Sequence, residues 1–337
     1  MKTSDFDFEL PNELIASYPL ERRDDSRMLT VIPGRDPGTQ VIEDKHVRDF
    51  VDYLQPGDVV VFNNSRVIPA RFNASGYEIT LHTSESDKIW WGLAKKFNKL
   101  NVGDILKTDC GTEIVVLDKN DDSGLKLEFK SDNVFQLLER IGKMPLPPYM
   151  KRSAELDDQN RYQTVYAKPI GSMAAPTAGL HFTDELLKQI EQRGAQIVNI
   201  TLHVGAGTWM PVKSDDLSEH KMHSEWGCIT ADQAATINAA KRVVAVGTTS
   251  LRLLESAATD TGISEFSAST DIFITPGYKF KCVDVLLTNF HLPKSTLFML
   301  VSAFAGVDEM KSAYKHAVDQ KYRFFSYGDC CLLFKKG

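Results

Sequence analysis

Disulfide-forming cysteine patterns and long apolar runs are both missing from this sequence. The five cysteines stand at positions 110, 228, 282, 330 and 331, an odd number with no C-x-x-C spacing. We therefore expect no disulfide framework and no thiolate zinc site, and reduced thiols fit a cytoplasmic protein. The longest apolar stretch, 297–304, is far shorter than the ~18–20 residues of a membrane span. The first twenty residues lack the apolar core of a signal peptide, so we expect neither targeting segment nor membrane attachment.

An excess of basic charge is also absent. Lysine and arginine total 39 against 45 acidic residues, which gives a formal net charge of −6. Compact nucleic-acid-binding modules are usually basic, so any contact with RNA or DNA would need a local basic patch. The 42% apolar and 25% charged residues exclude a disordered or collagenous chain, and the length predicts two domains.

The pattern of apolar residues changes twice along the chain. Residues 59–62 predict a buried strand, and short β runs separated by turn residues continue to about residue 130. Strands and helices alternate after that point, which favours an α/β sheet. The sequence therefore predicts an α/β domain of residues 1–56 and 131–337, into which residues 57–130 are inserted as a small antiparallel β-barrel.

Several later elements can be placed individually. Thr183 is expected to cap a helix over 184–193, and Thr230 and Gln233 form a capping box before another helix. The runs 271–275 and 284–290 predict strands, and a last helix is expected over 308–321.

Five polar segments contain more Gly, His and Thr than packing requires. Residues 174–183, with Gly179 and His181, lead into a helix N-terminus that suits a ligand, although a capped connector with a core histidine explains them too. The G-x-G of Gly205 and Gly207 is not a dinucleotide fingerprint, because the third glycine is missing. Trp209 suits stacking on a base or burial in a core.

The other three segments suggest acid–base and carboxylate chemistry. His220, His223 and Glu225 could ligate zinc, act as acid and base, or form a solvated loop; we expect no metal, because further ligands are absent. Thr248, Thr249 and Ser250 begin a helix where a carboxylate could bind or where one residue simply caps. Asn289, His291 and Lys294 follow a strand, where open α/β sheets bind ligands. Basic residues concentrate at the barrel and the proline-rich segment after it, namely Arg66, Arg71, Lys95, Lys96, Lys99, Lys143, Lys151, Arg152 and Arg161.

These same segments resemble one enzyme family over nearly the whole chain. The matching motifs include VVVFNNSRVIPARF, MPLPPYMKR, AAPTAGLHFT, LHVGAGTWMPV, EHKMHSEW, VGTTSLRLLES and LLTNFHLPKSTLFMLVSAF. They are similar to those of the S-adenosylmethionine:tRNA ribosyltransferase-isomerases of queuosine biosynthesis. Asn64-Ser65 departs from the more usual Asp-Thr of that family, and Trp209-Met210 from Phe-Gln.

The resemblance implies a reaction and an architecture. The aminomethyl group of 7-aminomethyl-7-deazaguanine at a tRNA wobble position would receive the ribosyl group of S-adenosylmethionine, which becomes an epoxycyclopentanediol while adenine and methionine leave. The family architecture is an α/β domain with an inserted Greek-key barrel. We expect a monomer that uses S-adenosylmethionine as co-substrate and tRNA as substrate.

The chemistry assigns roles to the residues. A primary amine has a pKa near ~10.4, so keeping it neutral at pH 7 costs roughly 4–5 kcal/mol. The acid–base candidates are His203 and Glu225 first, then His181, His223 and His291. The S-adenosylmethionine candidates are Gly179, Gly205, Gly207, Trp209, Thr248, Thr249, Ser250, Tyr278, Asn289 and Lys294. The tRNA phosphate candidates are Arg66, Lys95, Lys151 and Arg152.

Two other classes remain open from the residues alone. An S-adenosylmethionine-dependent RNA methyltransferase would use the same co-substrate, but the first half lacks a glycine-rich strand–turn–helix. A non-catalytic RNA-binding barrel protein conflicts with the net charge and with the polar, histidine-rich segments outside the barrel.

Overall fold

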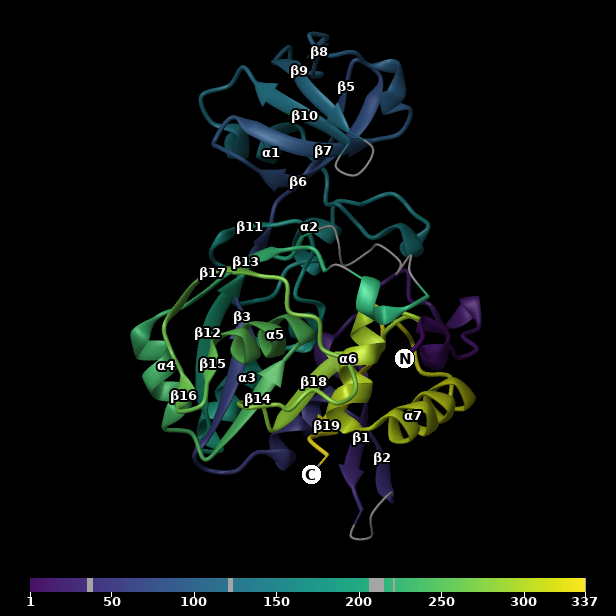
Figure 1. Cartoon of the computed structure of the whole chain (residues 1–337), viewed down its shortest axis with the longest axis vertical. Coiled ribbons are helices and arrows are strands. Elements are labelled where there is room, and N and C mark those ends of the chain that lie inside the picture. Colours follow the sequence, from purple (N-terminus) through teal and green to yellow (C-terminus); the bar gives the residue numbers. More distant parts are fainter. Residues whose placement is uncertain (35–38, 121–123, 206–214, 221, 337) are drawn as a thin grey trace.

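The computed structural model describes residues 1–34, 39–120, 124–205, 215–220 and 222–336. Figure 1 shows two bodies along its long axis: a six-stranded sheet with one helix lies above a larger body built on a nine-stranded sheet. This arrangement confirms the expected mixed α/β fold with an inserted barrel. No helix among the described residues is long and apolar enough to cross a membrane.

The nine-stranded sheet has four neighbouring parallel strands at its centre. Its order is β17-β13-β12-β3-β14-β18-β19-β1-β2, in which β12, β3, β14 and β18 run parallel. The remaining pairs are antiparallel except β1 with β19. The strands are β1 Arg27–Pro33, β2 Gln40–His46, β3 Asp58–Asn63, β12 Gln196–Leu202, β13 Glu225–Ile229, β14 Arg242–Val246, β17 Phe266–Thr270, β18 Val285–Asn289 and β19 Cys330–Phe334.

Apolar side chains alternate across this sheet, so both of its faces are covered. Val59 and Val61 of β3 belong to the core that α4, α5, α6 and α7 cover, whereas Val60 and Phe62 belong to the core on the other side, with α3. The helices are α3 Asp184–Gln192, α4 Ala231–Asn238, α5 Thr248–Ala257, α6 Thr296–Ala305 and α7 Val307–Asp319. The expected caps at Thr183 and Thr230 are confirmed.

The six-stranded sheet forms the barrel. Its order, β5-β6-β7-β10-β9-β8, is a Greek key, and an isolated bridge between Ala74 and Thr108 joins its two outer strands. Helix α1, Val134–Ile141, packs Val134, Leu137 and Leu138 into its core. The strands are β5 Arg71–Ala74, β6 Tyr77–Ser84, β7 Ile89–Ala94, β8 Ile105–Lys107, β9 Glu113–Asn120 and β10 Gly124–Phe129.

Two expectations about strands are wrong. The barrel does not start at residue 57. Strand β3, which follows that residue, pairs with β12 and β14 in the large sheet, and the barrel strands begin at Arg71. The second concerns 271–275, which is not a strand. Strand β17 ends at Thr270, opposite Glu225, the first residue of β13, so no neighbouring strand continues beyond it. Ile272 and Ile274 instead pack on the core as irregular chain.

Short strands lie between the two bodies, and one arginine holds the segment after the barrel against the N-terminal segment. Strand β4, Arg66–Val67, pairs in parallel with β11, Ile170–Ser172, below the barrel in Figure 1. Arg152 donates to both carboxylate oxygens of Asp158 at 2.7 Å and to the Ser17 carbonyl at 2.8 Å. The side chains of this ion pair are only 11% and 4% exposed, so a buried ion pair holds residues 152–158 against the N-terminal segment. The remaining short elements are α2 Asp158–Arg161, β15 Ala258–Thr259 and β16 Gly262–Ile263.

We expect Asp158→Asn to lower the free energy of unfolding by about 3–5 kcal/mol, because it leaves the Arg152 guanidinium buried without its counter-charge. Urea denaturation measures the change. Asp132→Asn is the matched control, since the Asp132 side chain is fully exposed beside Lys88. An equal effect in both variants would contradict the assignment.

The same pair predicts an acid dependence. Burial alone would raise the pKa of Asp158, but hydrogen bonds from Arg152, the Glu155 backbone and Tyr327 bring it below its usual 3.8. The contribution of Asp158 to stability is therefore complete above about pH 4 and disappears as the pH falls through the lower folded value. Asp158→Asn should remove this part of the acid dependence.

Candidate functional site

A cavity of about 420 Å³ lies where the parallel strands of the large sheet end. Three of its lining residues lie at or just after the carboxyl ends of these strands: Gly247 after β14, Asn289 at the end of β18 and Val204 shortly after β12. Ligands of open α/β sheets bind at this edge, and the volume lies within the ~300–1,000 Å³ of small-molecule sites. The cavity is therefore the candidate active site.

Asn63 connects three of the elements that form this edge. It is fully buried at the end of β3, where its Nδ2 donates to the Leu202 carbonyl at 2.9 Å and its Oδ1 accepts from the backbone N–H groups of Leu202 and Ser65. Nδ2 also lies 3.4 Å from Oγ1 of Thr249 on α5. Sequence reasoning did not single out Asn63, because its partners are distant in the chain.

The first residues of α5 lie at the cavity wall. Gly247 precedes the helix with φ of +89°, and no side chain caps the helix there. Thr248 and Thr249 line the cavity, as expected, so backbone N–H groups of the first turn are available to an anionic group. Ser250, by contrast, is buried and donates to the Val246 carbonyl at 2.8 Å, which gives it a structural role.

Asn289 presents an amide whose orientation is determined by its neighbours. Its Nδ2 lies 3.1 Å from Nε2 of His181, 2.9 Å from the Phe325 carbonyl and 3.4 Å from the Asp329 carbonyl. Carbonyls only accept hydrogen bonds, so the amide nitrogen must occupy this position, and His181 Nε2 must accept as well. Oδ1 is left buried without a partner among the described residues, while Asn289 lines the cavity. The geometry provides an acceptor for a ligand N–H or O–H.

His181 is therefore a neutral group behind the cavity. It is 3% exposed, and burial together with the charges of Arg23 and Arg323 lowers its pKa to about 3. Its neighbour Gly179 does not face the cavity, because a Cβ there would lie 2.0 Å from the Tyr166 hydroxyl. The expectation that Gly179 admits a ligand is not supported; its lack of a side chain accommodates Tyr166.

Of the five acid–base candidates, His291 alone lines the cavity. Its Nε2 lies 3.2 Å from Thr288 Oγ1, and its backbone N–H donates to the Tyr314 hydroxyl at 3.0 Å. Burial lowers its pKa to about 3, so the imidazole is neutral at physiological pH. Lys294 lies at the same wall and forms an exposed ion pair with Asp7 at 2.9 Å.

The two first-choice candidates occupy different surroundings. His203 stacks on Trp226 with 5.4 Å between ring centres, its Nδ1 is buried without a described partner, and burial lowers its pKa. Glu225 is 5% exposed, forms an ion pair with the buried Arg252 and accepts from the Gly205 N–H at 2.9 Å. The expected proton sharing between Glu225 and His223 is contradicted, because the carboxylate pairs with Arg252 and His223 is exposed.

Other candidates fall elsewhere. The Tyr278 hydroxyl donates to Glu255 at 3.2 Å, which with burial raises its pKa to about 12, and it is not part of the cavity wall. Gly207 and Trp209 lie outside the described residues, and no group of three potential metal ligands occurs within the described ranges. Sequence reasoning missed Tyr149 and Tyr162, both of which line the cavity, although the motif MPLPPYMKR, which contains Tyr149, was recognised.

The basic candidates separate into two kinds. Arg66, Lys95 and Lys151 are exposed and form no ion pair with any described residue. Arg152 is not available to a phosphate, because Asp158, Ser17 and Ser153 occupy its guanidinium N–H groups. Its expected phosphate contact is replaced by a structural ion pair.

The two buried histidines predict a pH dependence of stability. In the folded chain each has a pKa of about 3 against an ordinary 6.5, so only the unfolded chain gains these protons as the pH falls. We expect the free energy of unfolding to fall below pH 6.5, by at most ~1.4 kcal/mol per pH unit for each histidine, until about pH 3. Urea denaturation between about pH 6.5 and 5, where carboxylates stay ionised, measures this slope. His181→Asn and His291→Asn should each make the slope shallower, and an unchanged slope in both would contradict the assignment.

Comparisons with known proteins agree over the whole chain. The sequence model of a family described as queuosine biosynthesis protein matches residues 3–333. A protein of Parvibaculum lavamentivorans named S-adenosylmethionine:tRNA ribosyltransferase-isomerase is 48% identical over 351 residues, covering 99% of each chain. A protein of the same name from Rickettsia bellii is 46% identical and covers 100% of both chains.

A solved structure extends the likeness to three dimensions. The crystal structure of S-adenosylmethionine tRNA ribosyltransferase from Thermotoga maritima is 36% identical in sequence and has a TM-score of 0.56. The match covers 98% of this chain and 99% of that chain, so the matched part includes residues of both sheets. This chain belongs to the queuosine biosynthesis protein family.

Proposed function

We propose that this chain is an S-adenosylmethionine:tRNA ribosyltransferase-isomerase whose reaction takes place in the cavity at the carboxyl edge of the large sheet. It transfers the ribosyl group of S-adenosylmethionine to 7-aminomethyl-7-deazaguanine at the tRNA wobble position and isomerises it, so that epoxyqueuosine-tRNA forms while adenine and methionine leave. Family membership supports the reaction. The observation that supports its place is a cavity whose described wall has no acidic side chain.

The neutral wall matches the most demanding requirement of the reaction. An alkylamine must lose its proton before it can act as a nucleophile, and desolvation favours its neutral form. A carboxylate at the wall would instead stabilise the ammonium form. The described wall offers only neutral groups and one cation, Lys294, whose charge Asp7 balances at 2.9 Å, so it is desolvation that disfavours a protonated amine there. The cavity thus lowers the pKa of the amine without a strong base.

Two polar features can orient S-adenosylmethionine. The uncapped N-terminus of α5 supplies N–H groups for the methionyl carboxylate, and Lys294 adds a cation at the same cavity. Asn289 Oδ1 supplies an acceptor for an amino or hydroxyl group of the same molecule. Phe290, Tyr149 and Tyr162 supply aromatic surface, which is suited to a sulfonium cation.

Proton transfer is assigned to the histidines that can reach the reacting groups. His291 is at the cavity wall and neutral, so it can accept a proton transiently and return it. His203 is one residue from the wall and has an unpartnered ring nitrogen, which makes it the second candidate. Glu225 acts as a positioning residue, because it holds the Gly205 N–H through a carboxylate that Arg252 neutralises.

We expect incubation with S-adenosylmethionine and tRNA carrying the aminomethyl base to release adenine and methionine in equal amounts. Chromatography of the small molecules and mass analysis of the digested nucleosides measure the products. tRNA with guanine at the wobble position is the control, and it should give neither product because it lacks the amine.

Two outcomes of this assay would count against the proposal. Release of S-adenosylhomocysteine as the main product would identify a methyltransferase. Loss of turnover in EDTA that zinc restores would show that a metal takes part, contrary to our expectation.

We expect two cavity variants to separate binding from chemistry. His291→Asn should lower kcat by ~10²–10⁴-fold with little change in KM, if His291 transfers a proton. Asn289→Ala should mainly lower kcat/KM for S-adenosylmethionine, by ~10–100-fold, because it removes one hydrogen bond to the ligand. His316→Ala on α7, away from the cavity, should leave both constants unchanged. A His291→Asn effect below tenfold would move the proton transfer to His203.

A further inference from the structure

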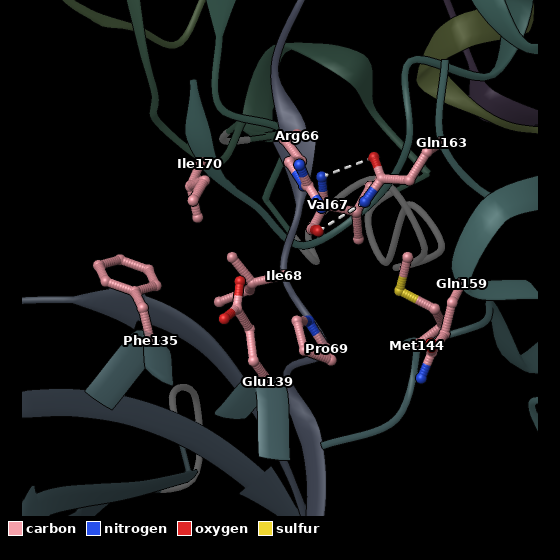
Figure 2. Close-up of a pocket in the computed structure, with 10 residues that line it drawn as sticks. All are labelled: Arg66, Val67, Ile68, Pro69, Phe135, Glu139, Met144, Gln159, Gln163 and Ile170. Atoms are coloured by element: carbon pink, nitrogen blue, oxygen red, sulfur yellow. Dashed lines mark hydrogen bonds between the residues drawn. The ribbon is translucent and has the colours of Figure 1, made fainter. Parts of the chain in front are cut away.

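A second, smaller cleft of about 120 Å³ lies at the junction between the barrel and the large sheet. Figure 2 shows it around Arg66–Pro69, with Phe135 and Glu139 from α1, Ile170 from β11 and Gln159 from α2. None of these residues lines the active-site cavity, so the cleft is a separate site.

The floor of the cleft is preorganised. The side-chain amide of Gln163 accepts from the Val67 N–H at 3.1 Å and donates to the Val67 carbonyl at 2.7 Å, as the dashed lines in Figure 2 show. Backbone bonds from Arg66 to Pro169 at 2.7 Å and from Ile68 to Ser172 at 2.9 Å hold the same stretch against β11. A ligand therefore meets a rigid surface and pays little ordering entropy on binding.

The wall combines apolar surface with hydrogen-bonding groups at its rim. Ile170 is 45% exposed although it is large and apolar, and the ring of Phe135 is partly exposed nearby. Glu139 and Gln159 are exposed and can bond the polar edge of a flat ring. The Glu139 carboxylate also disfavours a free anion inside the cleft, so a bare phosphate does not fit its interior.

Arg66, which also lines the cleft, provides the complementary charge. Its side chain is exposed, and neither an ion pair nor a side-chain hydrogen bond to a described residue engages its guanidinium. An apolar slot with polar edge groups and an adjacent free guanidinium matches one nucleotide, with the base inside and the phosphate on the arginine.

One of the two strands that form the floor, β11, continues to the active site. Strand β11 leads from Ile170 at the cleft to Ala174 at the cavity wall, four residues farther along. At ~3.3 Å per extended residue, the two sites are separated by roughly 13 Å. A single-stranded loop whose modified base enters the cavity therefore has neighbouring nucleotides within reach of the cleft.

We propose that this junction cleft binds a second, unmodified nucleobase of the tRNA loop while Arg66 contacts its phosphate. The inference rests on the proposed function, since it takes tRNA as the substrate. The cleft would then select among RNA molecules, whereas the reaction takes place in the separate cavity.

The test measures how tightly the protein binds RNA molecules from which one loop base at a time has been removed. A stem–loop RNA carries an abasic nucleotide at each loop position in turn, and its Kd is measured with the wild type and with Ile170→Ala. Phe135 is left intact, because it packs edge-to-face on Trp90 of the barrel core. The expected result is one position, other than the modified one, whose abasic form weakens binding by ~5–150-fold in the wild type but by less than about twofold in Ile170→Ala.

The contribution of Arg66 is measured separately, through the salt dependence of Kd. Arg66→Gln should weaken binding of every RNA in the set and lower the slope of log Kd against log salt by about one. Lys311→Gln on α7 and Val41→Ala on β2 are matched controls, since both residues are exposed and both elements lie far from the junction in Figure 1. Both should leave Kd and the salt slope unchanged.

The outcomes separate this inference from the proposed function. If no loop position couples to Ile170, or if Arg66→Gln leaves the salt slope unchanged, the cleft does not hold a nucleotide, whether or not adenine is still released from S-adenosylmethionine. Absence of adenine release by the wild-type protein would instead overturn the proposed function. Urea denaturation of each variant verifies that the fold is retained.

Discussion

The parallel pairing of β12, β3, β14 and β18 is the constraint on which the candidate site depends. Because the four strands run the same way, the segments that follow them all emerge at one edge of the sheet. Asn63 strengthens this arrangement, since one buried amide bonds the end of β12 and approaches the start of α5. Residues as far apart in the chain as Tyr149 and Ser326, 177 positions, thereby line one cavity.

The absence of acidic groups from the described cavity wall explains why its histidine, His291, is neutral. His291 has no carboxylate partner to stabilise its charged form, so burial alone decides its pKa. The acidic residues of neighbouring elements are engaged elsewhere: Glu225 with Arg252, and Glu255 with backbone N–H groups of 281–283. The fold thus engages these carboxylates, and Asp7 with the wall residue Lys294, instead of leaving an unpaired carboxylate where an amine has to be uncharged.

Sequence reasoning predicted the parts of the site that local patterns determine. Asn289, His291 and Lys294 follow a strand in one short segment, and Thr248 and Thr249 begin a helix, so the strand-end rule placed them together. It failed where a partner is remote in the chain. Glu225 resembled a catalytic base because Arg252 lies on another element. Arg152 resembled a phosphate ligand because the burial of its ion pair with Asp158, six positions away, depends on remote segments such as the one that contains Ser17, 135 positions away. The barrel boundary was set too early for the same reason, since an apolar run such as 59–62 does not reveal which sheet it will join.

The parallel pair β4 and β11 has a consequence for how such an enzyme could distinguish RNA molecules. Both strands are hydrogen-bonded to each other, and the chain after β11 bonds onward from Met173 to the Val204 carbonyl beside the cavity. The junction and the cavity are therefore linked by continuous, bonded backbone rather than by a free linker. In a chain with a net charge of −6, nonspecific attraction to RNA is weak, so selectivity has to come from a few well-placed contacts. A rigid spacing between two sites favours only those loops that can fill both at once.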